Sequence, residues 1–159
     1  MLTLSHILEA LTGTPIAGGQ QVVTDVVIDS RLAIPGSVFV ALPGERTDGH
    51  QFVGAAFANG AVAALVQQDT PDFYSLDLRE PITHDAVAAF KIPVRLRVAD
   101  SLVALQTVAR FWRARLDLRV VGITGSVGKT TTKEIIAAVL GTRYRTLKSE
   151  GNLNNEIGL

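Results

Sequence analysis

The sequence predicts an α/β fold arranged in two successive units. Short β-branched runs alternate with stretches of helical periodicity along the 159 residues. The run from Val120 to Thr124 enters a glycine-rich turn, and a Lys-Thr pair then opens a helix. Pro93 and the N-cap signal Asp100-Ser101 mark a change of element. We therefore expect one α/β unit over residues 1–98 and the start of another over residues 99–159.

Composition favours a packed globular protein. Hydrophobic residues make up 47% of the chain, charged residues make up 19%, and the formal net charge is zero. This balance argues against wholesale disorder and against a nucleic-acid partner or a membrane-surface protein. The absence of cysteine excludes a disulfide framework and a thiolate metal site. No signal peptide and no membrane-length apolar run is recognised, so we expect a cytoplasmic monomer.

The first unit is expected to begin with a helix over residues 5–11, capped by Ser5 and ended by Gly13. Expected strands cover residues 22–28, 38–42, 61–66 and 94–98, and Pro35-Gly36 makes a turn between the first two. A helix over residues 51–59 should turn Phe52, Ala55 and Ala56 inward. Residues 67–92 predict a long surface excursion with a brief helical patch near residues 85–90.

Two polar clusters follow expected strands of this unit, Asp29-Ser30-Arg31 and Asp48-Gly49-His50. Ligand crevices in open α/β sheets lie at the carboxyl ends of strands. Arg31 could pair with a diphosphate there, and Ser30 could hydrogen-bond a base or a sugar. The alternative is that both clusters are solvated turns. His50 taken alone is more typical of a structural residue at a helix start.

The glycine-rich turn has the layout of a phosphate-binding loop. Glycines let backbone N–H groups turn toward a phosphate, and the following helix presents its positive dipole end to the same anion. The common motif has a glycine where this chain has Ile123, so a turn without a ligand is the alternative. The residues expected to bind nucleotide phosphates are Gly125, Ser126, Val127, Gly128, Lys129, Thr130 and Thr131.

The second half should hold two helices. One over residues 102–116 carries apolar residues at helical spacing, and its Phe111-Trp112 pair is either core or a nucleotide platform. The other, Lys129 to Leu140, should bury an apolar face, and a strand is expected over residues 144–147. Few residues follow Lys129, and no acidic residue ends a later strand. We therefore expect a truncated second unit without a second Mg²⁺ ligand.

Several segments resemble the Mur ligases. The loop from Thr124 to Thr130 resembles their ATP loop, and residues 150–158 resemble an asparagine-rich stretch in one member of the family. Residues 29–31, 35–42, 44–46, 48–50 and Phe52 resemble their UDP-binding domain. The resemblance implies that residues 1–98 form this UDP-binding domain. It also implies that residues 99–159 are the incomplete beginning of a P-loop ATP-binding domain.

The resemblance further implies an ATP-dependent amide ligase that works through an acyl phosphate, with ATP and Mg²⁺ as cofactors. The implied substrates are UDP-N-acetylmuramoyl-tripeptide and D-alanyl-D-alanine. Lys129 would be catalytic and Thr130 would ligate the metal. Ser30, Arg31 and His50 would face the UDP moiety. Asn152 and Asn155 would contact the muramoyl portion or order their loop.

Two alternatives stay open. The first is another Mur-type ligase or one that resembles folylpolyglutamate synthase, although a folate enzyme has no need of the segment from Asp29 to Phe52. The second is a nucleotide-binding remnant without turnover, because the 159 residues alone are not expected to be active.

Overall fold

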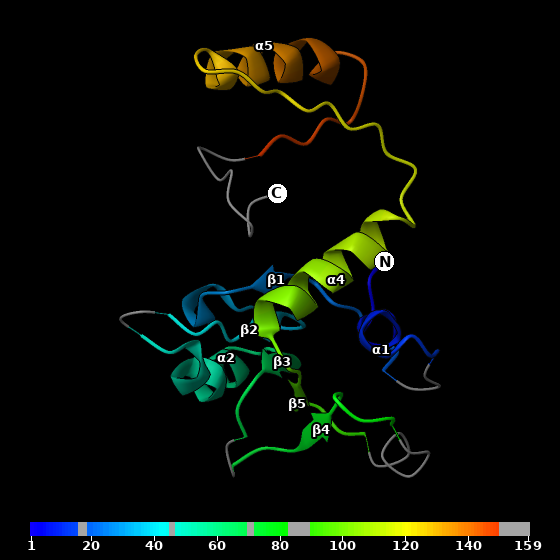
Figure 1. Ribbon diagram of the computed structural model, residues 1–159, viewed down its shortest axis with the longest axis vertical. Helices are drawn as coiled ribbons and strands as arrows, with labels where there is room; N and C mark the ends of the chain where they lie inside the picture. The colour runs from blue at the N-terminus through cyan, green and yellow to red at the C-terminus, as the bar shows by residue number, and fades with distance from the viewer. Residues whose placement is uncertain (16–18, 45–46, 70–71, 83–89, 150–159) are drawn as a thin grey trace. The chain divides into compact units, whose positions relative to one another are not determined.

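The computed structural model describes residues 1–15, 19–44, 47–69, 72–82 and 90–149. The chain divides into two compact units, Met1–Leu116 and Asp117–Leu159 (Figure 1). In the described part of the chain, no helix combines the length and apolar character needed to cross a membrane.

The first unit is built on a five-stranded sheet in the order β1-β2-β3-β5-β4. All four neighbouring pairs are parallel, so the carboxyl ends of the strands meet at one edge. The strands are β1 (Val26–Val27), β2 (Val38–Val40), β3 (Ala63–Val66), β4 (Ser75–Asp77) and β5 (Val94–Arg97). The predicted α/β class is therefore confirmed. Every residue of β2 and β3 is buried, as expected for strands covered on both faces.

Helices cover the two faces of this sheet. Successive strand residues point to opposite sides, so Val38 and Val40 join one buried cluster while Phe39 joins another. The first cluster includes residues of α1 (Leu4–Thr12) and α4 (Ser101–Arg113). The second includes residues of α2 (Val53–Ala58). Two short 3₁₀ turns, η1 (Ser30–Leu32) and η2 (Gly49–Phe52), lie beside α2.

Helix α4 belongs to the first unit, which corrects the expected division at residue 98. Ala104 and Val108 are buried in the same cluster as the strands, and α4 contacts α1, β2 and β3. Asp100 caps this helix as predicted, accepting a hydrogen bond from Val103 N–H. The cap signal was correctly recognised, but it marks a new helix on the same sheet. The boundary lies after Leu116.

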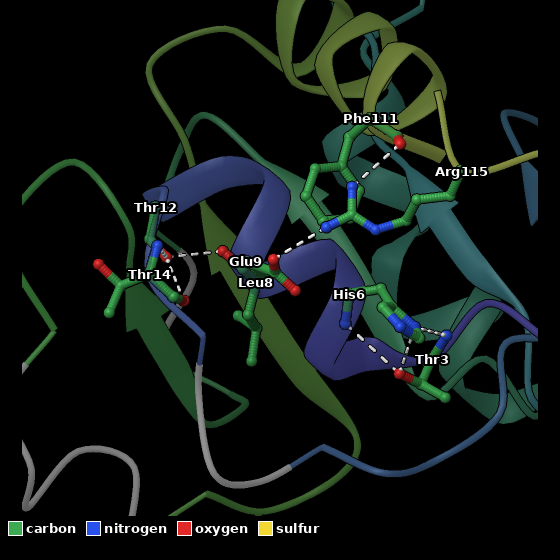
Figure 2. A network of polar contacts seen from close by, with 8 residues as sticks. All are labelled: Thr3, His6, Leu8, Glu9, Thr12, Thr14, Phe111 and Arg115. Atoms are coloured by element: carbon green, nitrogen blue, oxygen red, sulfur yellow. Dashed lines mark hydrogen bonds and ion pairs between the residues drawn. The ribbon is translucent and has the colours of Figure 1, made fainter. Parts of the chain in front are cut away.

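Polar contacts fasten the end of α4 to α1 (Figure 2). Glu9 of α1 accepts a hydrogen bond from Arg115, at 2.9 Å, and the Arg115 guanidinium lies 3.4 Å from the centre of the Phe111 ring. The Trp112 ring packs 5.4 Å from the ring of His6. Phe111 and Trp112 are half-buried at the end of α4 and are in neither of the two buried clusters, so the core interpretation is not confirmed.

Several expected element boundaries are corrected by the structure. The N-cap of α1 is Thr3 rather than Ser5, because Thr3 and His6 form a reciprocal capping box; Gly13 ends the helix as predicted. Only Val26–Val27 of the strand expected over residues 22–28 pair with β2. Strand β4 lies within the region predicted to be a surface excursion. The helical patch expected near residues 85–90 lies almost entirely outside the described residues.

The second unit contains one described helix, α5 (Lys129–Gly141). It begins where predicted, but none of its residues is buried, and Ile135 and Val139 are largely exposed. The strands expected over residues 120–124 and 144–147 do not form. Strand hydrogen bonds need a neighbouring strand, and the described residues of this unit supply none.

Candidate functional site

An open cleft of about 640 Å³ lies where β1 and β2 end. It brings together the two polar clusters that the sequence singled out, since parallel neighbouring strands end at the same edge. Its lining residues are Ile28, Asp29, Ser30, Arg31, Leu42, Thr47, Gly49, Phe52 and Ala55. The prediction that Phe52 and Ala55 point inward is wrong, since both line the cleft. The 3₁₀ turn η2 delays the start of α2 to Val53, so Val53 and Ala56 are the buried residues.

The first wall of the cleft is the turn that follows β1. Asp29 caps η1 by accepting a hydrogen bond from Arg31 N–H, at 3.0 Å. The same carboxylate holds the Arg31 guanidinium in a two-pronged contact, with Nε at 2.9 Å and Nη2 at 2.6 Å. Hydrogen bonds from the Arg31 side chain and backbone lower the pKa of Asp29 to about 2. The Arg31 side chain is 86% exposed, so Asp29 orients a guanidinium that solvent can reach.

Ser30 lies in this wall with most of its surface buried. Its backbone carbonyl accepts a hydrogen bond from the side-chain amide of Asn59, at 2.9 Å. Asn59 follows the last turn of α2, so this bond fixes the turn against that helix. Asn59 is a site residue that was not predicted from the sequence. No local signal marks it, because its partner lies far away in the chain.

The second wall is the turn that precedes α2. Asp48 caps η2 by accepting a hydrogen bond from His50 N–H, at 3.0 Å. This backbone bond and a second bond from the His50 ring lower the pKa of Asp48. Gly49 packs closely on the end of β2, since a Cβ there would lie 2.8 Å from the backbone N and O of Leu42. Any larger residue at Gly49 would force the two backbones apart.

His50 stands behind this wall and does not line the cleft. It is only 6% exposed, and both ring nitrogens contact the protein. Nδ1 lies 2.5 Å from Asp48 Oδ1, and Nε2 accepts a hydrogen bond from Gln67 N–H, at 2.8 Å. The structure thus brings Ser30 and Arg31 into the cleft as predicted, but it places the His50 ring in internal contacts. The sequence gives no signal for the partnership with Gln67.

In the second unit, the glycine-rich loop leads into α5. Gly125 and Gly128 both have positive φ angles, and Gly128 at +82° is the N-cap of the helix. This left-handed conformation favours glycine, and it leaves the first N–H groups of α5 pointing out of the helix end. Lys129 reaches back over the loop, donating from Nζ to the Gly125 carbonyl at 2.5 Å. The loop residues are exposed, as a phosphate site requires.

Thr130 is the candidate metal ligand of this unit, as the second residue of α5. Among the described residues, no group of three or more His, Cys, Asp or Glu side chains could hold a metal ion. An exposed hydroxyl beside a phosphate-binding loop fits Mg²⁺, which keeps several waters and takes further oxygens from nucleotide phosphates. Asn152 and Asn155 lie outside the described residues, so their roles stay predictions.

Both units match known families. Residues 22–113 match the Mur ligase family, catalytic domain, and residues 123–159 match the Mur ligase middle domain. The chain belongs to the Mur ligase family. Among curated relatives, the UDP-N-acetylmuramoyl-tripeptide–D-alanyl-D-alanine ligase of Bacillus subtilis is 41% identical over 99% of this chain and 31% of its own length. The Escherichia coli ligase of that name is 38% identical over 99% of this chain and 30% of its own length.

Solved structures agree with these relatives. The corresponding ligase of Acinetobacter baumannii matches 97% of this chain and 31% of its own, with 32% identity and a TM-score of 0.69. The MurF ligase of Thermotoga maritima, solved in complex with ADP, matches 94% of this chain and 28% of its own, with 32% identity and a TM-score of 0.65. The chain spans about a third of the length of the relatives it matches.

Proposed function

We propose that this chain carries the UDP-binding and ATP-binding regions of an ATP-dependent ligase. The ligase adds D-alanyl-D-alanine to UDP-N-acetylmuramoyl-tripeptide, a step in making peptidoglycan precursors in the cytoplasm. The observation that carries the proposal is the order of two sites along one chain. A cleft with an oriented arginine comes first, and a glycine-rich loop that opens a helix follows. Relatives with this ligase name match the chain over both regions.

The two units divide the work. The unit Met1–Leu116 binds the UDP end of the peptide substrate in its cleft. Arg31 pairs with the diphosphate, and Ser30 hydrogen-bonds the base or sugar. Ile28, Leu42 and Phe52 add apolar surface that suits the flat face of a base. Asn152 and Asn155 contact the muramoyl portion or order their loop.

The second unit holds ATP. Backbone N–H groups from Gly125 to Thr131 surround its phosphates, and Lys129 exchanges its contact with the Gly125 carbonyl for one with the phosphoryl oxygens. The Thr130 hydroxyl would hold Mg²⁺, which would supply neutralisation of the phosphate charge.

The reaction needs no protein nucleophile. The terminal carboxylate of the tripeptide attacks the γ-phosphorus of ATP, ADP leaves, and an acyl phosphate forms. The amine of D-alanyl-D-alanine then attacks the acyl carbon, loses a proton and expels phosphate. Positioning and charge neutralisation account for catalysis of this type.

Calorimetric titration of the chain with UDP tests the first site. We expect Arg31→Ala to weaken UDP binding by roughly 10–100-fold, because a charge-assisted hydrogen bond to a diphosphate is lost. Arg79→Ala is the matched control, since Arg79 makes the same two-pronged contact with Asp77 outside the cleft. Equal loss in both variants, or no UDP binding by the unaltered chain, would contradict the proposal. A chain that binds a folate in place of UDP would favour the folylpolyglutamate-synthase alternative.

A further inference from the structure

The proposed UDP cleft has one wall whose position depends on a residue outside the cleft. The wall is the turn of residues 47–52, which supplies Thr47, Gly49 and Phe52 to the lining. We infer that His50 is a positioning residue that holds this wall against the end of β3. The inference rests on the proposed function, since it assigns His50 to the geometry of the UDP site rather than to contact with UDP.

The ring of His50 bridges two elements. Its Nε2 accepts from the backbone N–H of Gln67, the residue directly after β3. An acceptor at Nε2 in the neutral ring requires the hydrogen to be on Nδ1, where it is directed at the Asp48 carboxylate. The two bonds therefore select one tautomer, and neither ring nitrogen is left for a ligand.

Asp48 completes the bridge from the other side. One oxygen receives both the His50 backbone N–H and the His50 ring, and the other lies 3.3 Å from the side-chain nitrogen of Gln68. Residues 48 and 50 are thus tied to residues 67 and 68 by two separate bonds. Gly49, between them, donates to the Leu42 carbonyl at 3.0 Å, which ties the same turn to β2.

Each residue of the Asp48-Gly49-His50 segment consequently has a different task. Asp48 orients the ring, Gly49 allows the close approach to Leu42, and His50 supplies the bridge to β3. Removal of the ring leaves the backbone N–H of the half-buried Gln67 without its acceptor, so the wall should loosen while the sheet remains. Phe52 and Thr47 would then lose their fixed positions in the cleft.

Nitrogen-15 NMR of the chain tests the bridge directly. The three histidines are few enough to assign, and His50 should show the shifts of a neutral ring protonated at Nδ1. These ring shifts should stay unchanged when UDP is added. A large shift of the His50 ring nitrogens on adding UDP would show direct contact and would overturn the inference.

Two substitutions test the consequence. In His50→Ala, the Gly49 and Gln67 amides should exchange at least tenfold faster, the Val38–Val40 amides should be unchanged, and UDP binding should weaken about tenfold. His50→Gln should recover much of the loss, because one side-chain amide offers a donor and an acceptor as the neutral ring does. His6→Ala is the matched control, since His6 makes capping contacts within α1.

The outcomes separate the inference from the proposed function. Unchanged exchange at Gly49 and Gln67 in His50→Ala would overturn the inference even if UDP binds. Failure of the unaltered chain to bind UDP would instead overturn the proposed function, and the exchange rates would still decide whether His50 holds the wall. If His50→Ala does not fold, the ring shifts and His50→Gln decide the matter. In that case, exchange of the Gly49 and Gln67 amides in His50→Gln that is as fast as the exchange expected for His50→Ala would count against the bridge, because the side-chain amide should restore much of it.

Discussion

Helices α4 and α5 have the same length, 13 residues each, yet they differ in almost everything else. Helix α4 buries Ala104 and Val108 against a sheet, whereas α5 buries no residue. Both begin directly after an N-cap residue that carries a local signal, α4 after Asp100 and α5 after Gly128. The comparison teaches that caps and loops determine where a helix starts, while a neighbouring sheet determines whether its apolar face is covered.

The candidate sites differ in the same way. The cleft walls are tied to the sheet and to α2 by contacts from Asn59 and Gln67, which are distant in the chain. The glycine-rich loop instead contains a local contact, the hydrogen bond from the Lys129 side chain to the Gly125 carbonyl, which joins residues only four positions apart. We therefore expect the cleft to depend on tertiary packing and the loop to depend on local geometry.

The largest expected effect concerns the loop. In a longer ligase that contains this chain, Lys129→Ala should reduce turnover by several orders of magnitude, because the charge directed at the transferring phosphoryl group is lost. The fold should remain, since the hydrogen bond that the Lys129 side chain donates to the Gly125 carbonyl is local and exposed. Phosphate release and circular dichroism measure the two quantities. Lys133→Ala, on the same helix, is the control, and comparable loss in both variants would refute the specific role of Lys129.

Hydrogen exchange tests the difference between the two helices in the chain itself. Amides of α5 should exchange on the order of a hundredfold or more faster than those of Val38–Val40, since a helix of this length without packing is marginally stable. Amides in the centre of α4 should be protected like the strands. Equally slow exchange throughout α5 would show that the second unit stabilises its own helix.

A matched pair of valine substitutions, one in each helix, should have smaller effects, which are measured on the free energy of unfolding. Val108→Ala in α4 should lower the free energy of unfolding by about 2 kcal/mol, because Val108 is 4% exposed. Val139→Ala in α5 should change it by less than about 0.5 kcal/mol, because Val139 is 65% exposed. Urea unfolding followed by the fluorescence of Trp112, the only tryptophan, measures the variant in the first unit, and far-ultraviolet circular dichroism measures the variant in the second. Similar values for the two variants would contradict the contrast between the helices.

The smallest expected effect is on pH dependence. Hydrogen bonds from Arg79 lower the pKa of Asp77 from 3.8 to about 2. A lowered pKa means that the ionised group stabilises the folded unit above pH 3.8, and that this contribution disappears as the pH falls toward 2. In Asp77→Asn, the free energy of unfolding measured in urea should therefore fall less steeply as the pH is lowered over this range.

The second unit supplies the control for that experiment. Lys148 lowers the pKa of Glu134 through a side-chain hydrogen bond, but Glu134 lies on the exposed surface of α5. Glu134→Gln should leave the urea midpoint of the first unit unchanged at every pH. An effect as large as that of Asp77→Asn would mean that the two units unfold together.

Local signals in the sequence determined much of this protein. The apolar runs of β2 and β3, the left-handed glycine that ends α1, and the cap of α4 all follow from the preferences of neighbouring residues. The glycine-rich loop before α5 belongs to the same group. Each of these features is decided within a few residues of chain, so a pattern of spacing is sufficient to predict it.

Tertiary structure decided the remainder. Pairing with β5 turns Ser75–Asp77 into an edge strand although only Leu76 is buried there, and packing on α1 keeps α4 with the first unit. The partnership of His50 with Gln67 moves a polar ring from the expected ligand site to the support behind it. These outcomes depend on groups brought together from distant parts of the chain. A hydrogen bond or a buried apolar face contributes stability only when the chain brings its partner into contact. Spacing along the chain could therefore not predict these outcomes.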